Sequence, residues 1–186
     1  VTADSPVGAA DDAAAVRALA EGADVLTFEH EHQDSALLER LQAEGVSVQP
    51  TPQALTLARD KLAMRRMMSG AGLPQPAWAE IGGPQQESTE QMVDAIDAFA
   101  AEHGWPVVLK TPRGGYDGKG VLVLESAGEA RERAASWFDQ LESRTDFSSL
   151  LAEEKVPFTR ELSALVARRE SGQVIPWPCL LYTSPS

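Results

Sequence analysis

Residues 106–124 of the chain read Pro106-Val107-Val108-Leu109-Lys110-Thr111-Pro112-Arg113-Gly114-Gly115-Tyr116-Asp117-Gly118-Lys119-Gly120-Val121-Leu122-Val123-Leu124. Two apolar, β-branched runs flank a loop that has four glycines in residues 111–120. This pattern predicts a strand, a glycine-rich loop and a second strand. In such a loop the backbone N–H groups can approach an anion closely, and basic side chains supply charge. The stretch therefore predicts a hairpin that holds a polyphosphate.

The loop does not fit the common phosphate-binding motifs. The phosphate loop G-x-x-x-x-G-K-[ST] is excluded because Gly120 follows Lys119, and the dinucleotide fingerprint is excluded because Gly120 leads into a strand and not a helix. An exposed hairpin with glycines at its turns is the alternative. The basic, tyrosine and aspartate side chains exceed what a turn needs. We therefore interpret the loop as a flap that folds over a nucleotide.

The composition narrows the class of protein. A hydrophobic content of 43% and a charged content of 24% are ordinary for a globular protein. The net charge of -12 argues against a nucleic-acid partner. One cysteine excludes a disulfide framework, and no apolar run approaches the ~20 residues of a membrane span. We therefore expect a cytoplasmic location and no membrane or nucleic-acid partner.

Periodicity and capping residues give the order of elements. Helices are expected over 11–21 and 35–44, from Pro52, from Lys61, from Thr89 to before Gly104, and from Ala127 to about Leu141. Strands are expected over 23–28, 46–48, 77–81, 107–110, 121–124, 149–155, 161–167 and 173–177. The pattern predicts a mixed α/β and α+β fold, with partial domains over 1–52 and 53–178. Residues 179–186 follow no strand period, so we expect a fragment with a non-native tail.

Lys110 and two glutamates are candidate binding residues. By a period of two, Lys110 shares a face with Val108, and a lysine among such neighbours usually has an anionic partner. It is either a phosphate contact or a strand-end lysine that reaches solvent. Glu153 and Glu161 flank a short connector whose backbone could border an adenine. A carboxylate at a strand end could accept hydrogen bonds from the hydroxyls of a ribose. On spacing alone, two solvated glutamates are the favoured alternative.

The cluster Glu29-His30-Glu31-His32 follows an expected strand. Alternate residues of a strand face opposite ways, so only two side chains could converge, which is too few for a tetrahedral zinc site. Open α/β sheets place ligands at the carboxyl ends of their strands. The cluster is therefore either part of a substrate site or a solvated loop.

Five segments, in this order, carry a resemblance to a known family: 24–32, 60–61, 106–110, 114–120 and 153–161. Together they resemble the 5-(carboxyamino)imidazole ribonucleotide synthases of purine biosynthesis over residues 22–178, in the style of the actinobacterial members. The Gly-Gly-Tyr-Asp-Gly-Lys-Gly loop is the most specific part. The resemblance implies the C-terminal part of a Rossmann-like pre-ATP-grasp domain, followed by the first part of an ATP-grasp domain.

The activity implied by this resemblance is that of a carbon–nitrogen ligase. ATP turns bicarbonate into carboxyphosphate, which carboxylates 5-aminoimidazole ribonucleotide and leaves ADP and phosphate. The resemblance also implies Mg²⁺ and a homodimer of the intact protein. The family's metal carboxylates lie beyond residue 178, so we expect no metal ligand here and an inactive fragment. Another ATP-grasp purine enzyme, such as formate-dependent glycinamide ribonucleotide transformylase, and a non-catalytic nucleotide-binding module are the alternatives.

The resemblance also implies roles for individual residues. Lys61 and Lys110 would contact the phosphates. Lys110, Arg113 and Lys119 would act in catalysis, with Arg113 and Lys119 neutralising transferring charge. The remaining ATP contacts would be the flap residues Gly115, Tyr116, Asp117, Gly118, Lys119, Gly120 and Val121, the adenine border Glu153, Glu154, Lys155 and Val156, and Glu161 at the ribose. Glu29 and Tyr116 would contact the aminoimidazole ribonucleotide.

Overall fold

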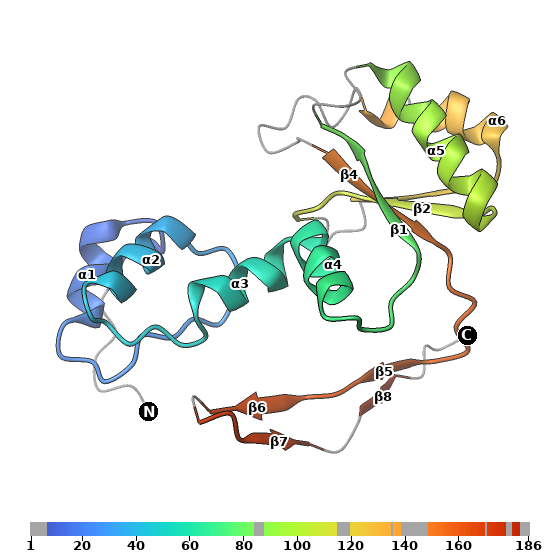
Figure 1. The fold of residues 1–186 in the computed structure, drawn as a ribbon. Helices are drawn as coiled ribbons and strands as arrows, with labels where there is room; N and C mark the ends of the chain where they lie inside the picture. Colours follow the sequence, from blue (N-terminus) through green and yellow to red (C-terminus); the bar gives the residue numbers. More distant parts are fainter. Residues whose placement is uncertain are drawn as a thin grey trace. The chain divides into compact units, whose positions relative to one another are not determined.

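The computed structural model describes residues 7–83, 88–114, 120–134, 136–138, 149–169, 171–177 and 180–182. The chain forms two compact units, Val1–Glu154 and Lys155–Ser186 (Figure 1). Among the described residues, no helix combines the length and the hydropathy that a membrane crossing needs. The domain boundaries predicted at residues 52 and 178 stay predictions.

Three short helices open the first unit: α1 (Ala13–Ala20), α2 (Ser35–Ala43) and α3 (Pro52–Arg59). The side chains of Asp12, Asp34 and Thr51 accept hydrogen bonds from backbone N–H groups in the first turns, as N-caps do. These helices bury one apolar cluster: Ala20, Leu26, Leu37, Leu38, Leu41, Val48 and Leu55. The helices predicted from periodicity are confirmed here.

The strands predicted over 23–28 and 46–48 are wrong in extent. The structure has a single parallel bridge between Leu26 and Val48. The Leu26 N–H donates to Ser47 O, and the Gln49 N–H donates to Leu26 O. Two short extended segments make a marginal pair, since independent sheets need three or more strands. Of residues 23–28 only Leu26 is buried, and Val25 is exposed. The apolar run therefore indicated the parallel pairing, but neither a fully buried nor a full-length strand.

A four-stranded antiparallel sheet follows, in the order β1-β4-β2-β3 (Figure 1). Its strands are β1 (Trp78–Gly82), β2 (Val107–Lys110), β3 (Val121–Leu124) and β4 (Ser149–Glu154). One face buries an apolar core against α5 (Thr89–His103), the short α6 (Ala127–Glu129) and the π-helical turn η1 (Ala130–Ala134). The helix predicted from Ala127 therefore begins as expected but widens into a π-helical turn.

The boundaries of α5 follow from its capping residues. Ser88 and Gln91 form a reciprocal capping box at its start, and Gly104 ends it with a φ of 87°, which favours glycine. A further helix, α4 (Lys61–Gly70), begins at the N-cap Asp60 and leads into β1. The start and end predicted for α5 and the start predicted for α4 are confirmed.

The second unit contains two short ribbons. Strand β5 (Glu161–Ser163) pairs with β8 (Leu180–Tyr182), and β6 (Val166–Arg168) pairs with β7 (Val174–Pro176). The single strand predicted over 161–167 is therefore wrong, because its two halves pair with different partners. Strand β8 lies within the segment predicted to be a non-native tail, and that assignment stays a prediction.

Candidate functional site

Lys110 lies at the end of β2 and points away from the sheet's apolar core. Its neighbours Val107 and Leu109 are fully buried in that core, which confirms the predicted alternation of faces. The antiparallel register pairs Val108 with Glu153 of β4, so Glu153 lies on the same face as Lys110. The Lys110 Nζ lies 2.5 Å from Glu153 Oε2. The anionic partner that the sequence predicted for Lys110 is therefore Glu153.

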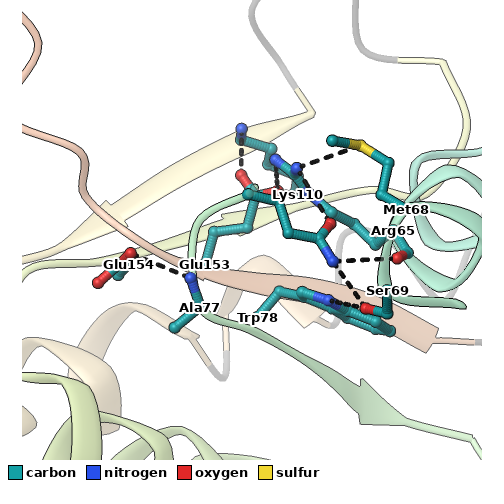
Figure 2. Close-up of polar contacts among 9 residues, drawn as sticks. Arg65, Met68, Ser69, Ala77, Trp78, Lys110, Glu153 and Glu154 are labelled. Carbon is teal, nitrogen blue, oxygen red and sulfur yellow. Dashed lines mark hydrogen bonds and ion pairs between the residues drawn. The ribbon is translucent and has the colours of Figure 1, made fainter. Parts of the chain in front are cut away.

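Glu153 is also held from the side of α4. The Arg65 guanidinium donates to the other carboxylate oxygen, with Nε 2.6 Å and Nη2 2.5 Å from Glu153 Oε1. Figure 2 shows the two cations converging on this carboxylate. Glu153 is only 3% exposed, and a buried carboxylate is stable only when it is paired in this way. The structure therefore adds Arg65 to the site that the sequence predicted.

Lys61, the first residue of α4, fixes this helix to the loop after β2. Its backbone N–H donates to Pro112 O at 2.9 Å, and its Nζ donates to Gly114 O at 3.0 Å. Burial and then the positive charge of Lys110 lower the pKa of Lys61, against smaller opposing effects from acidic neighbours that include Glu31. Lys61 is thus partly out of water and feels the positive charge of Lys110. This arrangement favours an anion, because an anion relieves their repulsion.

Arg113 lies at the start of the glycine-rich loop and is tied to Asp60. Its Nε lies 3.0 Å from Asp60 Oδ2, while Asp60 Oδ1 accepts the Ala63 N–H as the N-cap of α4. The structure brings Arg113, Lys61 and Gly114 together at the start of α4. The role of Arg113 in neutralising transferring charge stays a prediction.

The residues at the two ends of the loop pair with each other and continue the hydrogen bonding between β2 and β3. The Thr111 N–H donates to Gly120 O at 2.9 Å, and Val121 pairs with Lys110. Val121 is half-exposed on the same face as Lys110, so apolar surface borders the ammonium group. The two predicted strands that flank the loop are confirmed, and they pair with each other. Residues 115–119, which carry the predicted contacts Gly115, Tyr116, Asp117, Gly118 and Lys119, lie outside the described residues.

The predicted adenine and ribose contacts divide between the two units. Glu154 lies on the opposite face of β4 from Glu153, and its Oε1 accepts the Ala77 N–H at 3.0 Å. Lys155, Val156 and Glu161 belong to the second unit, where all three are exposed. Their roles at the adenine and ribose stay predictions.

Glu29 is exposed on the loop after Leu26 and lines a cavity of about 240 Å³ together with Phe28, Pro50 and Leu55. The neighbouring His30 and His32 rings are 5.8 Å apart. In the part of the chain that the structure describes, no three His, Cys, Asp or Glu side chains gather as a metal site would require. The role of Glu29 as a substrate contact stays a prediction.

The sequence reasoning missed Arg65, although a signal was present. Arg65 lies four residues after Lys61, and residues at this spacing share one face of a helix. Once Lys61 is placed at a phosphate site, a second basic residue on that face is a candidate for the same site. Glu153 was identified by its position at a strand end, but its pairing with Lys110 required the sheet register.

Comparison with known proteins agrees with the fold and the resemblance. The model of the ATP-grasp domain matches residues 66–184. The chain is 46% identical over 178 residues to the N5-carboxyaminoimidazole ribonucleotide synthase of Mycobacterium bovis, with 96% of this chain and 38% of that protein aligned. It is 40% identical over 200 residues to that of Mycobacterium leprae, covering 100% of this chain and 43% of that protein.

Among solved structures, an ADP complex of an N5-carboxyaminoimidazole ribonucleotide synthetase has a TM-score of 0.72 at 29% identity, covering 96% of this chain and 43% of that one. The predicted fold class and family resemblance are thereby confirmed. The chain spans less than half the length of these relatives.

Proposed function

Because the chain belongs to the ATP-grasp family, we propose that it supplies part of the ATP site of an N5-carboxyaminoimidazole ribonucleotide synthase. The reaction is the ATP-dependent carboxylation of 5-aminoimidazole ribonucleotide with bicarbonate, through carboxyphosphate, giving the N5-carboxylated nucleotide, ADP and phosphate. The relatives named for this activity support the choice over the transformylase and over a non-catalytic module.

The observation that carries the proposal is the pair of ammonium groups beside the glycine-rich hairpin. Lys61 and Lys110 come from a helix and a strand that are far apart in the sequence. Lys61 Nζ donates to the loop backbone at Gly114, and Lys110 is the last residue of β2 before that loop. Such a site binds a polyphosphate through fixed charge and backbone donors. Closure of the flap (Gly115–Val121) over the phosphates would keep water from carboxyphosphate.

Mg²⁺ belongs to the proposal because protein sites for this ion use one or two carboxylates together with substrate phosphates. The described residues offer no three-ligand cluster, so we assign no magnesium ligand to them. The bicarbonate substrate, the homodimer and the cytoplasmic location are also part of this proposal. When bound with ATP, Mg²⁺ would supply charge neutralisation at the phosphates.

The test measures ADP release by the full-length protein. Release should require ATP, bicarbonate and 5-aminoimidazole ribonucleotide together, and Lys110→Met should abolish it. Formate with glycinamide ribonucleotide serves as the competing substrate pair. ADP release that depends on this second pair, and not on the first, would replace the proposed reaction by that of the transformylase.

A further inference from the structure

Glu153 is the only buried charged residue among those that the structure describes. Its two carboxylate oxygens are divided between two cations: Arg65 donates through Nε to Oε1 and places Nη2 beside the same oxygen, and Lys110 donates to Oε2. Of the two cations, Arg65 is the more buried, with a side chain that is 11% exposed against 29% for Lys110. Lys110 therefore has access to solvent and to a ligand, while Arg65 is enclosed.

This division matters when a nucleotide binds. If Lys110 turns toward a phosphate, Glu153 Oε2 loses its partner. A buried carboxylate without a cation is strongly destabilised, so the departure of Lys110 would oppose nucleotide binding. A cation that stays on Oε1 whichever partner Lys110 has would remove this obstacle, and Arg65 is placed on that oxygen.

We propose that Arg65 is a positioning residue for nucleotide binding: it keeps Glu153 paired and fixed, so that Lys110 can exchange this carboxylate for a phosphate. The inference rests on the proposed function, because it assumes that the Lys110 site receives a nucleotide. Arg65 itself touches neither phosphate nor substrate in this scheme.

The surroundings of Glu153 support this role. From α4 it faces Arg65 and the more distant charge of Lys61, and from β2 it faces Lys110. Its neighbour on β1 is Trp78, which carries no charge. In the described part of the chain, Arg65 is thus the one cation that contacts Glu153 and is not itself assigned to a phosphate. Its planar guanidinium holds Nε and Nη2 in a fixed geometry against Oε1, whereas the ammonium group of a lysine is a single nitrogen on a flexible stem.

The test compares affinities for Mg²⁺-ATP, measured by titration calorimetry on the full-length protein. Arg65→Met should weaken binding by at least about tenfold, because Lys110 must then leave a stranded carboxylate. Adding Glu153→Gln to Arg65→Met should recover affinity, because no buried charge is left to strand. Arg65→Lys, which keeps the charge but not the fork, should weaken binding by about threefold.

Arg66→Met is the matched control. Arg66 lies on the same helix but pairs with Glu80, and both side chains are exposed. This variant should bind Mg²⁺-ATP as the unaltered protein does. Amide spectra of each variant separate a change in affinity from a loss of folding.

Two results would overturn the inference while leaving the proposed function intact. One is an unchanged affinity of Arg65→Met, or of Arg65→Lys if the methionine variant does not fold. The other is a double variant that binds as weakly as Arg65→Met. Absence of ATP binding by the unaltered protein would overturn both the inference and the proposed function.

Discussion

Replacing Lys110 by methionine should separate the contribution of this residue to folding stability from its contribution to nucleotide binding. Methionine keeps an unbranched side chain of similar length, so the change removes the charge with little loss of volume. The variant loses the 2.5 Å ion pair with Glu153 Oε2 but leaves Arg65 on Oε1. We therefore expect a modest loss of stability together with a large loss of nucleotide affinity.

The two magnitudes follow from the surroundings of Lys110. Removing one partner of a fully buried ion pair costs about 3–5 kcal/mol. Here Glu153 keeps a second cation and Lys110 is partly exposed, so we expect about 1–2 kcal/mol of unfolding free energy, or a fall in Tm of roughly 3–6 °C. A hydrogen bond between charged groups contributes about 1.5–3 kcal/mol, which corresponds to an ATP affinity roughly 10- to 150-fold weaker.

Urea unfolding and titration calorimetry with Mg²⁺-ATP measure the two effects on one preparation. Arg17→Met is the control for charge removal, since Arg17 and Glu44 are an ion pair with both side chains about half-exposed. This control should change neither quantity measurably. An ATP affinity of Lys110→Met equal to that of the unaltered protein would remove Lys110 from the phosphate site. Equal losses of stability in Lys110→Met and Arg17→Met would show that the Glu153 pair is not a buried interaction.

Three further changes test other parts of the structure. Folding lowers the pKa of Lys61 below its ordinary value of 10.5, so between the folded and the unfolded pKa the unfolded chain binds more protons than the folded chain. The free energy of unfolding should therefore rise with pH between these two pKa values. Urea unfolding at a series of pH values should show this rise, and Lys61→Met should flatten it. Ser88→Ala removes the capping box of α5 and should cost about 1 kcal/mol, and a change near zero would mean that this helix end frays in the native protein. Ile96→Ala, at a fully buried position of α5, should cost about 2–5 kcal/mol by the same method, and a cost below that of Ser88→Ala would contradict its place in the core.

The elements that could be predicted from the sequence are those whose signals are local. Asp34, Thr51 and Ser88 mark helix starts through hydrogen bonds that span three residues, and periodicity needs only one turn or one strand. The hairpin of β2 and β3 follows from two apolar runs joined by a glycine-rich loop. For the same reason the predicted strand over 161–167 failed, because its pairing depends on strands later in the chain.

In the candidate site, too, residues marked by local signals could be predicted, whereas contacts between distant segments could not. Lys61, Lys110 and the flap could be predicted as candidates because their residue types and order are distinctive in the sequence, and their roles at a nucleotide stay predictions. The partner of Lys110 could not, because Glu153 is separated from it by 43 positions and reaches it only through the register of β2 and β4. Arg65 was missed since a basic residue on a helix is ordinary until the structure places its guanidinium against a buried carboxylate.

The amino-acid sequence alone therefore determined the glycine-rich loop, the helix boundaries and the alternation that turns Lys110 out of the apolar core. Each depends on neighbours within a few residues, where backbone sterics and capping act. Only the tertiary structure decided that Lys110 and Arg65 share one carboxylate. That arrangement depends on the distance between three segments, which is set by sheet register and by the packing of a helix.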